Sequence, residues 1–314
     1  MLATCKRAGL SFLALSFGLP VGMQTQTIVP AQSAPAPLGK LIDVGGCRVH
    51  LYCIGTGSRA VVIVGAGYSF DWGLVQPEVA KFTQVCSYDH SGIGWSDSGP
   101  KDSCSLRVNE VHTALKNANI KGPYVLVGHS LGGLVARMYE AQYPDEVAGI
   151  VFVDPAFVMI SRLTVSDGAK VKTAQPTPAP PIFLGKAFGL EDDPNFQKLS
   201  PRDRDLHNWF IAQSRHQAAL QSNHETSMQC VARADAFSKA HPRPLGERPL
   251  VDVSNEEMRS PDYVRLQSQL LSLSQNSKEL IAEKNGHFVI IDRPDVVIDA
   301  ISRVVQSVHN NAKL

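Results

Sequence analysis

The sequence lacks an excess of charge of either sign, and it lacks several motifs that accompany common functions. Its 314 residues carry 30 Lys and Arg against 29 Asp and Glu, a formal net charge of +1. No basic stripe with interleaved aromatics occurs, so we expect no nucleic-acid partner. The six cysteines contain no Cys-x-x-Cys spacing, and the segment Ser91–Gly99 lacks the third glycine of a dinucleotide fingerprint. We therefore predict neither a metal nor a cofactor.

Acidic residues are absent before Asp43. Lys6 and Arg7 precede the apolar run Ala8–Met23, and small residues follow at Ala31–Ala36. This order is typical of a secretory signal peptide, so we expect one over residues 1–34, with its boundary left open, and a secreted or periplasmic protein. The apolar run is shorter than the roughly 20 residues that span a bilayer. We expect no stable membrane insertion after processing, whereas an uncleaved leader would anchor the chain.

Five cysteines follow the predicted leader: Cys47, Cys53, Cys86, Cys104 and Cys230. Export permits disulfides. Because five is odd, at least one thiol is expected to stay free or to pair between chains, and the sequence does not give the pairing.

Strand and helix signals alternate over most of the remaining chain. Continuous apolar runs at Ala60–Gly67 and Val147–Phe157 are typical of strands buried on both faces, while Leu106–Ile120 has helical spacing. Gly45 and Gly46 separate two shorter strand signals and indicate a hairpin.

The alternation breaks once and then resumes. The break contains the Pro/Ala-rich segment Val171–Pro181 and polar helical stretches such as Arg215–Phe237. This pattern predicts one parallel-sheet domain formed by residues 39–157 and 247–314, with a cap inserted at residues 158–246.

A serine stands between glycines in the stretch YVLVGHSLGGLVARMYEA, Tyr124–Ala141. Four apolar strand residues precede this Gly-x-Ser-x-Gly pattern, and an amphipathic helix follows at once. In such a turn the serine hydroxyl is lifted clear of the sheet, and the N-terminus of the helix faces the reacting group. We predict that Ser130 is the catalytic nucleophile.

A serine nucleophile needs a base, and the base needs an orienting carboxylate. Of the ten histidines, His287 lies after an apolar strand signal, in a loop that would return over the turn at Ser130, here called the nucleophile elbow. Asp154 ends the strand after the elbow helix, on the same sheet edge as Ser130. We predict His287 as base and Asp154 as acid. Alternative acids follow the next strand signal: Glu256, Glu257 and Asp262.

The attack on a carbonyl also requires donors for the oxyanion. The N–H of Leu131 follows the nucleophile, and glycines let the turn Gly65–Gly67 approach a ligand closely. We predict Ala66 as the second donor, with Gly67 as the next choice. Four side chains are candidates for the substrate pocket: Tyr68, His129, Phe183 and Phe188.

Four blocks of the sequence together resemble the α/β-hydrolase superfamily, and more narrowly its bacterial lipase- and esterase-like members with a helical cap. The blocks are VGAGYSFDW, SYDHSGIGWSD, VLVGHSLGGLVARMYEAQYP with VFVDPA, and NGHFVIIDRPDVVIDAI. The resemblance implies a mostly parallel eight-stranded sheet flanked by helices, with an inserted helical cap, and acyl-enzyme chemistry at Ser130. No Gly-x-x-Asp follows Arg248–Asn255, where many relatives place the acid, and this supports Asp154.

The expected function is therefore a serine hydrolase that cleaves small-molecule or lipid-like carboxylic esters. Superfamily members that open epoxides or remove halides use an aspartate at the elbow, so Ser130 argues against both. An aminopeptidase, a C–C bond hydrolase or a perhydrolase would use the same triad. These enzymes stay open as alternatives, together with a non-catalytic binding module.

Overall fold

The computed structural model describes residues 34–156 and 189–314. The predicted signal peptide as far as residue 33, and the pocket candidates Phe183 and Phe188, lie outside these ranges. Within them, no helix combines the length and the apolar character that crossing a membrane requires.

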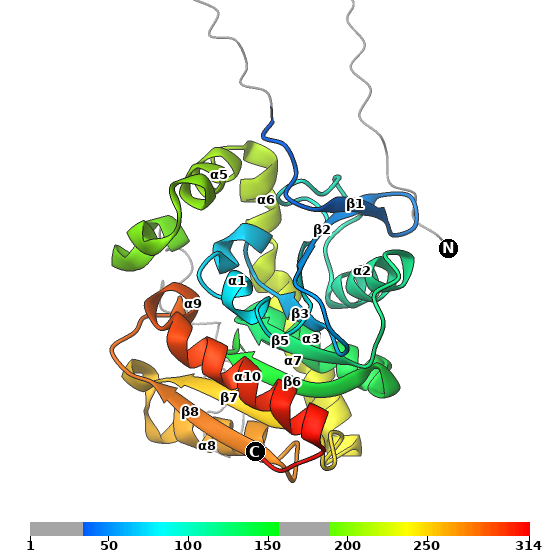
Figure 1. Cartoon of the computed structure of the whole chain (residues 1–314), viewed down its shortest axis with the longest axis vertical. Coiled ribbons are helices and arrows are strands. Elements are labelled where there is room, and N and C mark those ends of the chain that lie inside the picture. Colours follow the sequence, from blue (N-terminus) through cyan, green and yellow to red (C-terminus); the bar gives the residue numbers. More distant parts are fainter. Residues whose placement is uncertain (1–33, 157–188) are drawn as a thin grey trace, which may run out of the picture.

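One eight-stranded sheet forms the centre of the molecule, in the order β1-β2-β4-β3-β5-β6-β7-β8 (Figure 1). The β1–β2 and β2–β4 pairs are antiparallel, and all the other pairs are parallel. This confirms the predicted sheet and the hairpin at Gly45-Gly46. The strands are β1 (Lys40–Asp43), β2 (Arg48–Ile54), β3 (Val61–Val64), β4 (Val85–Asp89), β5 (Tyr124–His129), β6 (Val147–Val153), β7 (Leu250–Asn255) and β8 (Ser277–Ala282).

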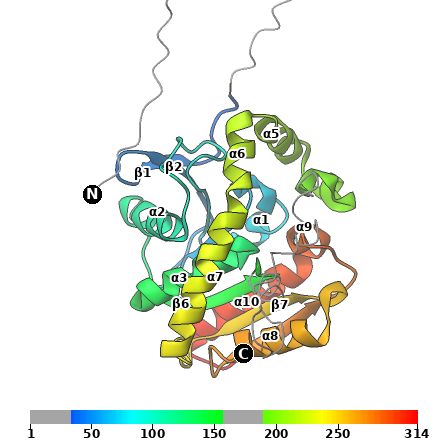
Figure 2. The same ribbon diagram turned by 180° about the vertical axis from the view of Figure 1, so that it is seen from behind.

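Helices cover both faces of the sheet (Figures 1 and 2). On one face lie α1 (Gln76–Val79), α9 (Val289–Asp292) and α10 (Pro294–Asn310). On the other lie α2 (Cys104–Asn117), α3 (Leu131–Gln142), α7 (Asn223–Ala240) and α8 (Pro261–Leu271). The remaining helices of the described residues are η1 (Ser69–Trp72), η2 (Pro144–Glu146), η3 (Leu190–Asp192), η4 (Pro194–Lys198), α5 (Pro201–Ile211), α6 (Ser214–Gln221) and η5 (Glu256–Met258).

The apolar strand signals arise from this two-sided cover. All four residues of β3 are buried. Val61 and Ile63 belong to the same buried cluster as the side chains of α10, whereas Val62 and Val64 belong to the cluster that contains those of α3. A strand between two helical layers has no solvent face, so its sequence reads as a continuous apolar run instead of an alternating one.

The part of the predicted cap that the structure describes contains α5, α6 and α7. The first two lie at the end of the molecule opposite α8, while α7 runs back along α3 (Figures 1 and 2). The helical stretch predicted at residues 215–237 is divided at Ser222, whose hydroxyl donates to Asp102 Oδ2 at 2.7 Å and also contacts the Ala219 carbonyl. The boundaries 158 and 246 stay predictions.

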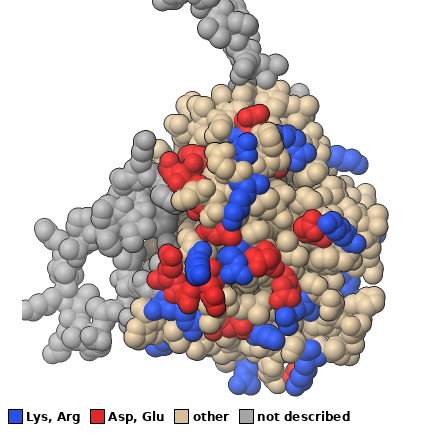
Figure 3. Space-filling model, turned by 60° about the vertical axis from the view of Figure 1, so that its left-hand side comes forward, with Lys and Arg blue, Asp and Glu red and all other residues tan. Residues whose placement is uncertain are grey.

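Among the described residues, two disulfides join elements that are distant in the chain. Cys53–Cys86 links β2 to β4, and Cys104–Cys230 links α2 to α7. Cys47 is buried and belongs to neither bond. The charged side chains on the face shown in Figure 3 are interleaved, with basic and acidic groups next to each other, as the near-zero net charge suggests.

Candidate active site

Ser130 occupies the sharp turn between β5 and α3. Its backbone angles, φ 54° and ψ −125°, are strained for a residue with a side chain. Backbone hydrogen bonds of both the N–H and the carbonyl keep Ser130 in this conformation. The Ser130 N–H donates to the Val153 carbonyl at 3.2 Å, and the Ser130 carbonyl accepts from the N–H groups of Gly133 and Ala156, each at 3.0 Å.

The glycines of the elbow are required by close packing. A side chain on Gly128 would collide with the backbone of Gly132 and Gly133. A side chain on Gly132 would collide with the Val64 carbonyl at the end of β3. The start of α3 therefore lies directly against the turn that follows β3.

Ser130, His287 and Asp154 form one chain of hydrogen-bonding groups, although they come from three separate parts of the sequence. Ser130 Oγ lies 3.0 Å from His287 Nε2, and His287 Nδ1 lies 2.8 Å from Asp154 Oδ2. Asp154 follows β6 and its side chain is 2% exposed, while the His287 side chain is 26% exposed. The carboxylate is thus buried, while the imidazole that it contacts is partly exposed.

Two of the alternative acids, Glu256 and Glu257, take no part in this contact. Glu256 and Glu257 are exposed in η5, and the side chain of Asp262 lies outside the described part of the structure. Asp252, in β7, is fully buried. Burial, together with the nearby Glu279 and Asp154 carboxylates, raises the pKa of Asp252 well above its ordinary value, which favours its neutral form.

The loop that carries His287 is held by polar contacts to its backbone. His129 Nε2 donates to the His287 carbonyl at 2.9 Å, and Asn255 Nδ2 donates to the Gly286 carbonyl at 3.0 Å. The Gly286 N–H donates to Asp292 Oδ2 at 2.7 Å. Burial and then the charge of His287 lower the pKa of His129 to about 4, so its ring is neutral.

Sequence reasoning missed these positioning residues or gave them another role. His129, a candidate for the substrate pocket, is buried and contacts the His287 carbonyl and the ring of Trp72. Asn255 and Asp292 were not singled out. A polar residue at the end of β7, on the sheet edge that also carries Ser130 and Asp154, was the available signal for Asn255.

The predicted oxyanion donors lie in two adjacent turns. Leu131 is the first residue of α3, so its N–H has no acceptor within the helix. Ala66 lies in the turn after β3, which α3 contacts at Gly132. The carbonyl of Ala66 accepts from Asn223 Nδ2 at 3.3 Å.

Tyr68 follows this turn and lies in an aromatic cluster with Phe70 and Phe210. Its side chain is buried, and its hydroxyl has no hydrogen-bond partner among the described residues. Burial, followed by the Asp71 carboxylate, raises the pKa of Tyr68. The hydroxyl therefore stays protonated.

A second histidine–carboxylate cluster lies beside Tyr68. His207 Nδ1 is 2.7 Å from Asp71 Oδ1, and His207 Nε2 is 3.0 Å from Glu191 Oε2. Burial alone would lower the pKa of His207, but the two carboxylates raise it to about 10. Asp71 also accepts the Tyr68 N–H at 2.9 Å.

Within residues 34–156 and 189–314, no group of three or more His, Cys, Asp or Glu side chains is arranged to hold a metal ion. The expectation that the protein uses neither metal nor cofactor stays a prediction. The described groups can perform a proton relay: a hydroxyl, an imidazole that accepts and returns its proton, and a buried carboxylate behind it.

Comparisons with known proteins address the family and the fold. An uncharacterized protein of Schizosaccharomyces pombe is 34% identical over 159 residues, which cover 41% of this chain and 30% of that protein. The 2-hydroxymuconate semialdehyde hydrolase of Pseudomonas sp. CF600 is 31% identical over 134 residues, 40% of this chain and 46% of that protein. The chain thus spans less than half the length of these curated relatives.

Solved structures show the same fold. An epoxide hydrolase superposes with a TM-score of 0.60 at 17% sequence identity, covering 85% of this chain and 97% of that one. The model of the alpha/beta hydrolase fold family matches residues 61–294, a range that contains Ser130, Asp154 and His287. The chain belongs to the α/β-hydrolase family.

Proposed function

We propose that this protein is a serine hydrolase that cleaves carboxylic esters through an acyl-enzyme intermediate. The observation that carries the proposal is the unbroken contact from Ser130 Oγ through His287 to Asp154, at 3.0 Å and 2.8 Å. Both distances lie within hydrogen-bonding range, and the serine occupies the strained turn of a nucleophile elbow.

Each group has a distinct part in the proposed reaction. Ser130 Oγ attacks the ester carbonyl while His287 Nε2 takes its proton, and Asp154 orients and stabilises the resulting imidazolium. The N–H groups of Leu131 and Ala66 stabilise the oxyanion. His287 then returns the proton to the leaving alcohol. Water deacylates the enzyme with His287 again acting first as base and then as acid.

A C–C bond hydrolase is the second candidate, and the similarity to 2-hydroxymuconate semialdehyde hydrolase favours it. The same triad would serve both reactions, as it would serve an aminopeptidase or a perhydrolase. The solved epoxide hydrolase supports only the fold, and the serine at position 130 argues against that chemistry.

A substrate panel tests the proposal. The panel contains p-nitrophenyl esters with acyl chains from C2 to C16, an aminoacyl amide and an epoxide. A vinylogous 1,5-diketone, whose hydrolysis breaks a C–C bond, tests for a C–C bond hydrolase. We expect ester hydrolysis that Ser130→Ala abolishes and that Ser272→Ala, an exposed position at the end of α8, leaves unchanged. Ester turnover that survives Ser130→Ala, or diketone cleavage without ester turnover, would contradict the proposal.

We also propose that the protein is exported. The predicted leader supports this, and so do the two disulfides, which persist in oxidising compartments. N-terminal sequencing of protein recovered from the periplasm or medium should find a start near residue 35. Intact Met1 in a membrane fraction would instead favour the anchored form.

A further inference from the structure

The turn Gly65–Gly67, which carries the second proposed oxyanion donor and is called the oxyanion turn below, contacts a residue from a helix that is distant in the chain. Asn223, the first residue of α7, donates through Nδ2 to the Ala66 carbonyl at 3.3 Å. A peptide unit is planar, so this carbonyl and the N–H of Gly67 move together. The direction of the Ala66 carbonyl therefore sets how the N–H of Gly67, the second choice for the oxyanion donor, is presented. The N–H of Ala66, the first choice, belongs to the preceding peptide and is linked to this carbonyl only through the Ala66 Cα.

The orientation of the Asn223 amide is fixed by its other partner. Arg107 Nη2 donates to Asn223 Oδ1 at 2.7 Å. A guanidinium only donates hydrogen bonds and stays protonated at any ordinary pH. The oxygen of the amide must therefore face Arg107, which leaves the NH₂ group to face Ala66.

Arg107 is itself locked in place. Its side chain is 1% exposed and makes a two-point contact with Asp102, at 2.9 Å and 2.5 Å. Burial opposes ionisation of Asp102, but the guanidinium overrides it and holds the pKa of Asp102 below its ordinary value. Asp102 also accepts from Ser222 and Thr226 at the start of α7, at 2.7 Å and 2.9 Å.

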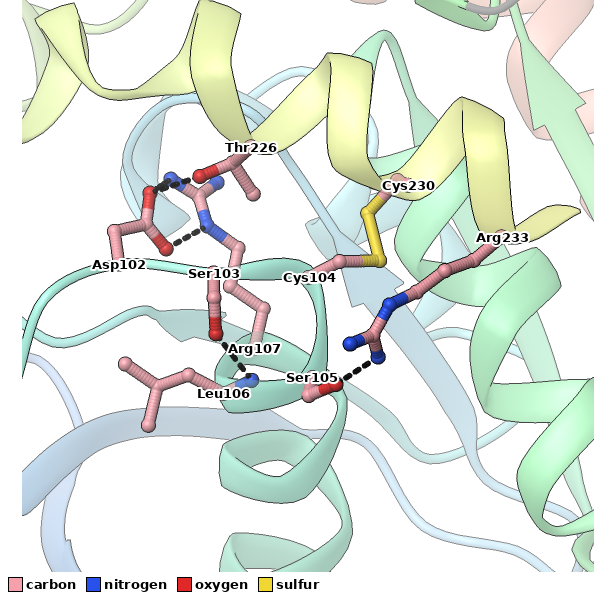
Figure 4. The surroundings of a disulfide bond; sticks show 9 residues. All are labelled: Asp102, Ser103, Cys104, Ser105, Leu106, Arg107, Thr226, Cys230 and Arg233. Carbon is pink, nitrogen blue, oxygen red and sulfur yellow. Dashed lines mark hydrogen bonds and ion pairs between the residues drawn. A yellow bond between two sulfur atoms is a disulfide. The ribbon is translucent and has the colours of Figure 1, made fainter. Parts of the chain in front are cut away.

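A disulfide holds the two helices together beside this network. Figure 4 shows Arg107 and Thr226 converging on Asp102, close to the Cys104–Cys230 bond between α2 and α7. Side chains from both helices thus fix the position of Asn223. The beginning of α3 lies on the same turn as Ala66, because Gly132 contacts the Val64 carbonyl.

We propose that Asn223 is a positioning residue for catalysis. It fixes the peptide unit between Ala66 and Gly67, so that the oxyanion turn is presented to the tetrahedral intermediate at Ser130. The proposal rests on the serine-hydrolase function proposed above. It gives the Asp102–Arg107 pair a role in the reaction, since that pair determines which end of the amide faces the turn.

Asn223→Asp tests the proposal with little change in shape. The new side chain keeps an acceptor for Arg107 but turns an oxygen toward the Ala66 carbonyl. Asn117→Asp is the matched control, because Asn117 Nδ2 donates to the Asp43 carbonyl at 2.7 Å at the exposed end of α2. Three quantities are measured for each protein: kcat and KM on an ester, the rate of Ser130 labelling by a fluorophosphonate probe, and the thermal midpoint.

We expect Asn223→Asp to lower kcat and the labelling rate about tenfold to a hundredfold, because complete loss of an oxyanion donor costs roughly 10²–10³. We expect KM to stay within about twofold and the control to match wild type. Wild-type rates in Asn223→Asp, an equal loss in Asn117→Asp, or a loss that appears only with loss of folded protein would overturn the proposal.

Labelling separates this inference from the proposed function. A wild-type protein that reacts with the probe but hydrolyses no ester would refute ester hydrolysis, while the labelling rates of the variants would still decide the role of Asn223. A wild-type protein that reacts with neither would overturn both. If Asn223→Asp does not fold, Asn223→Ala, which removes the donor without adding charge, is judged by the same criteria.

Discussion

His287 and His207 each contact a buried aspartate, yet the group on the other side of the ring differs between them. His287 lies between Asp154 and the hydroxyl of Ser130, with its side chain 26% exposed. His207 lies between Asp71 and Glu191, with its side chain 4% exposed. The first has one carboxylate neighbour and one hydroxyl that can give up a proton, whereas the second has a carboxylate on each side.

The comparison shows what a histidine needs in order to exchange protons. Two carboxylates raise the pKa of His207 to about 10, so it remains a cation throughout the neutral range and acts as a fixed link between η1, η3 and α5. An imidazole that is to accept a proton from serine must instead be neutral at rest. One carboxylate orients such a ring, while a second would keep it permanently protonated.

The largest expected effect follows from removing the charge behind His287. Asp154→Asn should lower kcat for ester hydrolysis roughly 10⁴-fold, because the amide favours the wrong tautomer of the imidazole. His207→Gln, assayed alongside, should retain most of kcat per folded molecule. If Asp154→Asn turns over at the wild-type rate while Glu256→Gln or Glu257→Gln is inactive, the acid has been wrongly assigned.

A smaller effect, on stability, is expected at the other histidine. His207→Gln should lower the free energy of unfolding by about 3 kcal/mol, because it leaves Asp71 buried without its cation. Urea unfolding measures the change. The control is His112→Gln, which removes a more exposed histidine from Glu146, 3.3 Å away, and should cost about 1 kcal/mol or less. Equal losses in the two variants would show that burial of the His207 cluster adds nothing.

The smallest effect is a pH dependence. The pKa of His207 is raised in the fold from 6.5 to about 10. Its stabilising contribution is therefore complete below about pH 6.5, declines as the pH rises, and is lost above about pH 10. The difference in unfolding free energy between wild type and His207→Gln should decline across this window, by at most about 1.4 kcal/mol over any one pH unit and by no more than about 3 kcal/mol in all. A difference that stays constant from pH 7 to 10 would mean that His207 is not held as a cation.

The sequence was most informative where a local pattern has a single structural cause. The continuous apolar runs predicted strands covered on both faces, and the elbow predicted where Ser130 lies in the fold. Asp154 was predictable because polar residues at the ends of parallel strands meet at one edge of the sheet. His287 was predictable from its loop after the last strand.

The supporting contacts were not predictable, because their partners are far apart in the chain. Asn223 contacts Ala66, which lies 157 residues earlier in the chain, and His207 contacts Asp71, which lies 136 residues earlier. These pairs depend on where α5 and α7, which lie within the insertion, pack against the core, and no local pattern encodes that placement. The division of residues 215–237 at Ser222 has the same origin, since the hydroxyl there contacts Asp102.

The Cys104–Cys230 bond also determines what happens to the protein after proteolytic cleavage of the chain. Ser130 and Asp154 lie inside the loop that this bond closes, whereas His287 lies beyond it. A protease that cleaves anywhere between residues 157 and 188 would divide the nucleophile from its base in the chain, yet both fragments would stay covalently joined. On a denaturing gel the nicked protein should migrate as one species without reductant and as two with it.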